Sequence, residues 1–266
     1  MFAVLGSVFL FSGLMGCKKT VDAPATLAEL SPWLWQSFDD DDPEVLVAGL
    51  ESLTVFAQSN LDLGSDPPWD ERSFDSLNSF YREDVDGFVD HSRDPQSTVG
   101  VGIFYSSEHS VLRHLDIIGL EDQTPVEPSS PDHYVRDFVE NTPACMADFS
   151  CEVLRSINDI HRDNVIYELE YELFKDWRWI QLSAGEALLA RSGNLDQNSN
   201  DGSVKVLQGY SIDVYLPVAS GSLRYQTVWQ ETDLPGGLTD EQMTGSVLKG
   251  IDTLLDHHDA FLAGER

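Results

Sequence analysis

The stretch VIYELEYEL (residues 165–173) alternates apolar and acidic side chains with a period of two. Successive side chains of a strand point to opposite faces of a sheet, so this pattern predicts a strand with one face toward a core and an acidic face toward water. The alternation continues over residues 177–181 after an expected turn at Lys175-Asp176. Further strands are predicted as follows: residues 186–191, residues 204–216 with a bulge at Gly209, and residues 223–229 after a turn at Gly221.

Short connections rich in Gly, Asn and Asp join these strands, which favours an antiparallel meander over parallel units with crossover helices. Upstream, residues 99–105 predict one more strand, and residues 134–139 and 151–160 are interpreted as helices. Downstream, Thr239-Asp240-Glu241-Gln242 has the spacing of a capping box. Apolar residues then recur every three to four positions up to Phe261, which predicts an amphipathic helix of about six turns.

The N-terminal third predicts helices instead. Thr26 and Glu29 stand at capping-box spacing, and Pro32 is expected to break or restart the first helix at Ser31. Pro43 after Asp42 marks the start of a second helix. A further short helix is expected within residues 73–81. The predicted fold class is α+β. It comprises a helical N-terminal segment (26–95) with a helical hairpin, and an antiparallel α+β domain (96–266) with about five or six strands and a long C-terminal helix packed on the sheet.

The charge balance excludes one class of partner. The 266 residues contain 16 Lys and Arg against 46 Asp and Glu, a formal net charge of -30. Nucleic acids and anionic lipid surfaces attract clustered Lys and Arg, so this chain is not expected to bind nucleic acid.

Residues 1–15 form an uncharged apolar run that is too short to span a membrane as a helix, which needs about twenty residues. The four residues Leu14-Met15-Gly16-Cys17 resemble the lipobox of bacterial lipoproteins. The resemblance implies a signal peptide at 1–16, a lipidated Cys17 as the first mature residue and the membrane as a partner through its acyl chains. Residues 17–25 would be a polar tether. The alternative is a buried N-terminal strand with a chance cysteine.

The lipobox resemblance also implies a location. We expect a lipid-anchored protein of the cell envelope, on the periplasmic or surface face. In enterobacterial lipoproteins an Asp at the second mature position favours the inner membrane, and Lys18 stands there instead. This difference favours the outer membrane.

Cys145 and Cys151 remain once Cys17 is assigned to lipid, and five residues separate them. Exported proteins meet oxidising conditions, so the expected state is a disulfide, which would stabilise a local turn by about 2 kcal/mol. Two free thiols are an alternative. A redox pair is a second, although the spacing is not CxxC and no Lys, Arg or His between them would lower a thiol pKa.

A calcium site is the main metal hypothesis. The segment 196–202 (DQNSNDG) places oxygen ligands at Asp196, Asn198, Asn200 and Asp201. It departs from the EF-hand pattern in the position of its glycine and lacks the final Glu, so a polar hairpin loop without a cofactor is favoured. The four consecutive acids at 39–42 could also hold a cation, but a solvated helix boundary explains them.

No catalytic motif is found. The sequence contains no GxSxG, HExxH, GxxxxGK[ST] or GxGxxG stretch. A divergent hydrolase would require His109, His114 or His161 beside a carboxylate and a hydroxyl in a cleft. The run 159–163 (DIHRD) supplies at most two converging metal ligands, and His257-His258 near the end of the last helix is explained by the helix dipole.

The element order of residues 99–266 resembles that of helix-grip proteins, the START-like lipid-binding superfamily. The resemblance implies that the last helix lies across a curved sheet and closes an apolar cavity lined by inward tyrosines and tryptophans. Alternatively, these aromatics fill a solid core. The leading hypothesis is a lipid-anchored envelope protein with a non-enzymatic binding or scaffolding role, toward a protein partner or a small apolar ligand. The alternatives are a carrier of an apolar small molecule and, least supported, a hydrolase. Whether the last helix covers a cavity or a filled core distinguishes a carrier from a scaffold.

Overall fold

The computed structural model describes residues 21–62, 67–89, 92–128, 132–163, 168–195, 205–233 and 240–265. The predicted signal peptide, Cys17 and the calcium-loop residues Asp196, Asn198, Asn200 and Asp201 lie outside these ranges, as does Thr239 of the predicted capping box. The predictions made for them therefore stay predictions.

The described residues form one antiparallel sheet of eight strands in the order β1-β2-β8-β7-β6-β5-β4-β3. The strands are β1 (Ser73–Leu77), β2 (Val99–Ser107), β3 (His133–Glu140), β4 (Val153–Asp163), β5 (Glu168–Leu182), β6 (Gly185–Asn194), β7 (Lys205–Val218) and β8 (Gly221–Asp233). The α+β class and the antiparallel meander are confirmed, whereas the expected count of five or six strands is too low. The strands β1, β3 and β4 account for the difference, because they were predicted as helices.

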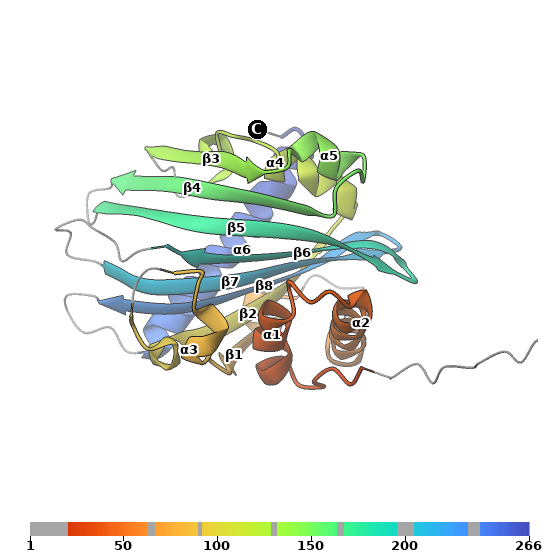
Figure 1. Ribbon diagram of the computed structural model, residues 1–266, viewed down its shortest axis with the longest axis horizontal. Helices are drawn as coiled ribbons and strands as arrows, with labels where there is room; N and C mark the ends of the chain where they lie inside the picture. Colours follow the sequence, from red (N-terminus) through yellow and green to blue (C-terminus); the bar gives the residue numbers. More distant parts are fainter. Residues whose placement is uncertain are drawn as a thin grey trace, which may run out of the picture.

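Three layers stack on one another (Figure 1). The long helix α6 (Asp240–Leu262) covers one face of the sheet, here called the inner face, while α1 (Leu27–Gln36) and α2 (Pro43–Asn60) cover the other, the outer face. The short helices are α3 (Arg82–Val85), α4 (Leu115–Ile118) and α5 (Pro143–Ala147), with single 3-10 turns at Trp69–Glu71, Pro95–Ser97, Val111–His114 and Thr124–Val126. The helical hairpin and the C-terminal helix are both confirmed.

The helix predictions for β3 and β4 fail because the inward side chains of these strands are partly polar. Arg136 of β3 and Asn158 of β4 are buried, and the Arg136 Nε donates a hydrogen bond to the Asn158 Oδ1 at 2.8 Å. A strand whose inner face carries such a pair lacks the apolar alternation by which strands are recognised.

The expected turn at Lys175-Asp176 is also wrong, because β5 runs through both residues. Each charge has a partner on its own face of the sheet. The Lys175 Nζ contacts the Asp213 Oδ2 at 2.5 Å on the inner face, and Asp176 pairs with Arg191 on the outer face. Paired charges can therefore occupy the middle of a buried strand.

The predicted bulge is displaced by two residues. The β7 and β8 register shifts between Val206 and Gln208, whereas Gly209 pairs regularly with Gln230. A Cβ at Gly209 would lie 2.9 Å from the Asn194 Oδ1, so close approach explains this glycine.

Pro32 does not break α1, which continues to Gln36. A proline inside a helix leaves the carbonyl four residues earlier without its donor. Here that carbonyl belongs to Ala28, and it accepts a hydrogen bond from the Asn78 N–H at 3.0 Å. A distant loop therefore replaces the lost bond.

The segment 26–95 also adds a strand to the sheet. Residues 73–77 form β1 beside β2, where a helix was expected, and α3 begins later at Arg82. One apolar cluster contains residues of both this segment and the strands that follow, among them Leu34, Trp35 and Trp229.

The acidic run 39–42 joins the hairpin to the sheet. The Asp42 side chain accepts from the Glu44 N–H and caps α2, as predicted. Asp39 forms ion pairs with Arg191 and Arg155, and the Arg178 guanidinium donates to the Phe38 carbonyl at 2.6 Å.

No helix of the described ranges combines the length and apolar character needed to cross a membrane.

Candidate ligand-binding site

A cavity of about 770 Å³ lies between the inner face of the sheet and α6. Ligand sites for small molecules occupy about 300–1,000 Å³, so this volume suits one small molecule. The apolar part of its wall comes from five strands and from α6, with the residues Tyr134, Ile160, Tyr171, Leu173, Val206, Tyr210, Val228, Val247, Ile251 and Leu254.

α6 packs on the strands mainly at β2, and the cavity lies beside this contact. Leu248, Ile251 and Leu255 form an apolar cluster with Val101 and Ile103 of β2. The helix residues that line the cavity include the exposed Ser246, Gly250 and Thr253, besides the apolar Val247, Ile251 and Leu254. A Cβ added at Gly250 would meet no atom within 4 Å. A space therefore remains between α6 and the strands beyond β2.

The expectation of a cavity lined by the strand tyrosines and tryptophans is only partly correct. Tyr134 and Tyr171 do line it. Tyr225 and Trp229, however, lie fully buried in the cluster that also contains the hairpin helices α1 and α2. The molecule thus has both features that the sequence left open, a cavity on the inner face and a solid aromatic core on the outer face.

A second, smaller pocket of about 50 Å³ adjoins the cavity. The two share the residues Glu127, Tyr134, Lys175, Gln226 and Leu254. The rest of its wall contains the polar residues Gln123, Arg136, Asp213, Tyr215, Arg224 and His258 and the apolar residues Ile117, Ile118 and Trp177. Of the ionisable residues in this wall, only His258 belongs to a pattern that the sequence points to.

Lys175 and Asp213 form the central ion pair of this pocket, with 2.5 Å between the Nζ and Oδ2 atoms. Burial lowers the Lys175 pKa, but the Asp213 carboxylate together with Tyr215 and Tyr134 outweighs it, so the pKa lies above its ordinary value. The ammonium is therefore charged at neutral pH, and the pair is electrically balanced.

The two arginines are not balanced in this way. Arg136 and Arg224 are 5% and 2% exposed, and no carboxylate of the described residues lies within ion-pair distance of either. Their hydrogen-bond partners are neutral. Arg136 donates to the Asn158 side chain and the Ile118 carbonyl, and Arg224 donates to the Tyr215 hydroxyl at 3.1 Å.

His258 completes the contacts of Arg224, with 3.3 Å between its Nδ1 and the Arg224 Nη1. Burial lowers the His258 pKa well below its ordinary value, and the Arg224 charge lowers it further. The imidazole is therefore neutral at pH 7, and its Nδ1 can accept from the guanidinium.

Several buried polar atoms of the site have no hydrogen-bond partner among the described residues. They are the Asp213 Oδ1, the Gln226 Oε1, the Asn194 Nδ2 and the Trp177 Nε1. Buried polar groups nearly always have partners, and an unpaired one costs about 1–3 kcal/mol. Water or the polar part of a ligand would satisfy these atoms.

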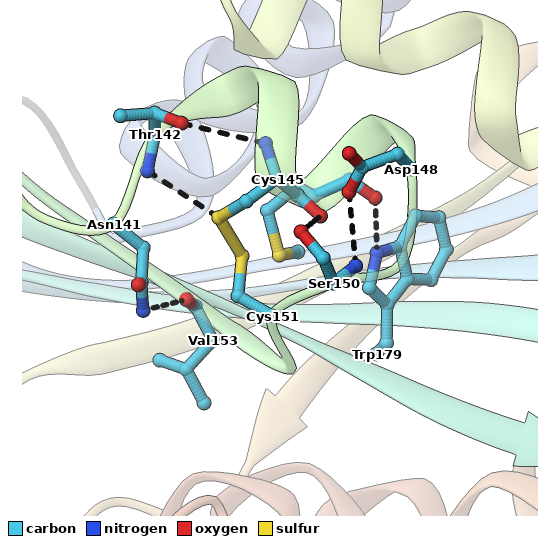
Figure 2. The surroundings of a disulfide bond; sticks show 9 residues. Asn141, Thr142, Cys145, Asp148, Ser150, Cys151, Val153 and Trp179 are labelled. Atoms are coloured by element: carbon cyan, nitrogen blue, oxygen red, sulfur yellow. Dashed lines mark hydrogen bonds between the residues drawn. A yellow bond between two sulfur atoms is a disulfide. The ribbon is translucent and has the colours of Figure 1, made fainter.

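The predicted disulfide between Cys145 and Cys151 is confirmed, with Cα atoms 5.4 Å apart. Figure 2 shows its surroundings. The Thr142 hydroxyl caps α5, and the Trp179 Nε1 donates to the Met146 carbonyl at 3.0 Å. The bridge therefore fixes the turn that covers the inner face at the end away from the large cavity.

The described histidines do not form a hydrolytic site. The buried His114 contacts the Ser222 Oγ at 2.9 Å, and burial lowers its pKa to about 2. His109 contacts the backbone carbonyl of Asp259, while the Ser107 hydroxyl donates to the carboxylate of that residue. Among the described residues no carboxylate contacts the His114 ring, and the His109 ring contacts a backbone carbonyl and no hydroxyl, so neither forms a Ser-His-Asp arrangement.

His161 lies at the sheet margin, where it pairs across β3 and β4 with His133, and its neighbour Asp159 contacts the His133 ring at 3.2 Å. Within the part of the chain that the structure describes, no group of three His, Cys, Asp or Glu residues could hold a metal ion.

Comparison with known proteins gives limited results. No family model matches the sequence. No curated protein matches it either. Among solved structures, a STAR-related lipid transfer protein fragment from Xanthomonas axonopodis is similar at 11% identity and a TM-score of 0.41, covering 65% of this chain and 90% of its own.

Two more solved structures have similar values. TTHA0849 from Thermus thermophilus is 13% identical with a TM-score of 0.40, over 62% of this chain and 98% of its own. Ara h 8.0201 is 8% identical with a TM-score of 0.37, over 63% and 99%. At such values the likeness carries no conclusion about ligand or function.

Proposed function

We propose that this chain binds a small molecule with an apolar body in the cavity between the sheet and α6. The observation that carries the proposal is the cavity itself, at about 770 Å³, with apolar walls from Ile160, Leu173 and Val228. A protein that acts only as a scaffold has no need of such a space. Its interior would be expected to pack as densely as the outer face does.

Binding of N-phenyl-1-naphthylamine tests the proposal, because this neutral apolar dye fluoresces when it leaves water. The probe is titrated into the full chain carrying Cys17→Ser, so that no covalent lipid can occupy the cavity. A saturable rise in fluorescence with one site is expected.

Two glycines of α6 supply matched variants. A Cβ at either Gly245 or Gly250 meets no atom within 4 Å, but only Gly250 lines the cavity. Gly250→Phe should weaken dye binding about tenfold or more by filling the space, while Gly245→Phe should leave it unchanged. Equal effects of the two variants, or no saturable binding by the parent chain, would contradict the proposal.

We further propose that the ligand is carried at a membrane of the cell envelope through a lipid on Cys17. The Leu14-Met15-Gly16-Cys17 lipobox supports this part, and the cavity does not bear on it. Mass spectrometry of the membrane-extracted chain should give an N-terminal Cys17 with acyl chains. An unmodified Met1 terminus would contradict the anchor and leave the cavity proposal standing.

A further inference from the structure

The small pocket beside the cavity carries a charge opposite in sign to that of the molecule as a whole. The chain carries a net charge of -30, yet three cations, Arg136, Lys175 and Arg224, line the small pocket. Asp213 balances Lys175. The other carboxylate in the wall is that of Glu127, which is partly exposed and also lines the large cavity.

Arg136 and Arg224 therefore remain as buried cations with neutral partners. Taking a guanidinium out of water is costly unless an anion or several hydrogen bonds compensate it. The Arg224 Nε and the Arg136 Nη2 donate to no described residue, since the donors that do form bonds are the Nη2 of Arg224, its Nη1 toward His258, and the Nε and Nη1 of Arg136. Each arginine thus keeps a donor for a ligand.

The unpaired Trp177 Nε1 adds a third donor. Its indole is 1% exposed, lines the same pocket, and lies under the Arg136 guanidinium at 4.8 Å from ring centroid to Cζ. A group that accepts hydrogen bonds and carries negative charge would satisfy all three donors together.

The size of the pocket limits that group. A void needs about 10–15 Å³ for each water-sized group, so about 50 Å³ has room for three or four heavy atoms. A carboxylate has three heavy atoms, whereas a phosphodiester with its ester oxygens has more.

On the basis of the proposed function, we infer that the ligand is an anionic amphiphile of the carboxylic acid class, whose carboxylate enters the small pocket between Arg136 and Arg224. Its apolar body lies in the larger cavity against Leu173, Val228 and Leu254. The Asp213 Oδ1 and Gln226 Oε1 are acceptors, so a bound water beside the carboxylate would supply their donors.

Three ligands with one tail and different head groups test the inference. Dodecanoate, methyl dodecanoate and dodecylamine are compared as competitors of N-phenyl-1-naphthylamine on the full chain with Cys17→Ser at pH 7.5. Dodecanoate should bind about tenfold or more tightly than its methyl ester, because hydrogen bonds between charged groups are about twice as strong as neutral ones.

Variants then show which residues cause the preference for the acid over the ester. Arg224→Gln and Arg136→Gln should each remove most of the preference for the acid over the ester. Arg224→Lys, which keeps the charge, should retain a preference. Arg82→Gln removes the same charge from α3 on the outer face and should leave the preference unchanged. If the buried variants fail to fold, the comparison of head groups on the parent chain still decides.

Equal binding of acid and ester would overturn the anionic head group and leave the cavity proposal intact. Tightest binding of the amine would overturn it as well and would place the head group against Asp213 and Glu127. If no ligand displaces the dye although the dye binds, the inference fails. If the dye itself does not bind, the proposed function fails too.

Discussion

The two faces of the sheet are covered by helices of different composition. On the outer face, α1 contributes Leu30, Leu34 and Trp35, which are fully buried in one aromatic cluster with the strands. On the inner face, α6 lines the cavity with the exposed Ser246, Gly250 and Thr253 as well as with Val247, Ile251 and Leu254. The outer face therefore supplies much of the packing energy, and the inner face is free to hold a ligand.

Truncating a large side chain should lower the unfolding free energy much more on the outer face than on the inner face. Trp35 contacts Phe80, Phe174 and Tyr210 with ring centroids 5.2–5.8 Å apart, so Trp35→Ala should cost about 3–5 kcal/mol of unfolding free energy. Leu254 lies half-buried on the cavity wall, and Leu254→Ala should cost less than about 1 kcal/mol because little packing is lost. Urea unfolding measures both losses, and similar values would show that the inner face is packed as firmly as the outer.

The sequence predicted the outer face better than the inner one. The strand residues Ile212, Val214 and Tyr225 alternate cleanly because they meet apolar helices. β3 and β4 were missed because their inner faces carry Arg136 and Asn158, whose pairing depends on residues 22 positions apart. Periodicity detects apolar contact and cannot detect a polar contact of this kind.

The charged residues of the site were missed for a related reason. The sequence pattern predicts a turn at Lys175. In the structure Lys175 instead continues the alternation of Tyr171, Leu173 and Trp177 on one face of β5. A single cation inside an otherwise apolar alternation was the available signal. Its partner Asp213 lies two strands away, and that position follows only from the sheet order.

Acid should affect the inner face through His114. Burial lowers its folded-state pKa to about 2, whereas the unfolded chain takes up the proton near pH 6.5, so stability is present above pH 6.5 and is lost as the pH falls. Between pH 6.5 and 5 this amounts to about 2 kcal/mol. Urea unfolding at both pH values should show that much less acid destabilisation in His114→Gln, which lacks the titration and can still contact Ser222.

Titratable groups that do not interact with His114 contribute equally in the parent chain and in the variant, so they cancel in the comparison. The His258 pKa is also lowered, chiefly by burial, and His258 is present in both proteins. An equal loss of stability in the parent chain and in His114→Gln would mean that the folded protein accommodates a charged His114.

Removing the disulfide tests whether the turn that it fixes influences the cavity. The double variant Cys145→Ser, Cys151→Ser should lower the unfolding free energy by about 2 kcal/mol, as expected for so short a loop. Neither cysteine lines the cavity, so affinity for N-phenyl-1-naphthylamine should not change. A change in dye affinity would show that the turn beside Trp179 helps to shape the site.

The same substitution on opposite sides of the sheet gives the smallest and sharpest contrast. A Cβ at Gly49 of α2 would lie 2.3 Å from the Trp33 Cζ3 and 2.8 Å from the Leu34 Cδ2, so Gly49→Ala should cost about 1–3 kcal/mol through overpacking. A Cβ at Gly250 of α6 meets no atom within 4 Å, so Gly250→Ala should gain about 0.5–1 kcal/mol from helix propensity alone. Opposite signs of the two changes in urea unfolding would show that Gly49 is closely packed and that Gly250 has open space around it. A loss of stability in Gly250→Ala would mean that α6 packs more closely on the sheet than the open space at Gly250 indicates. Ligand binding would then require the helix to move away from the sheet.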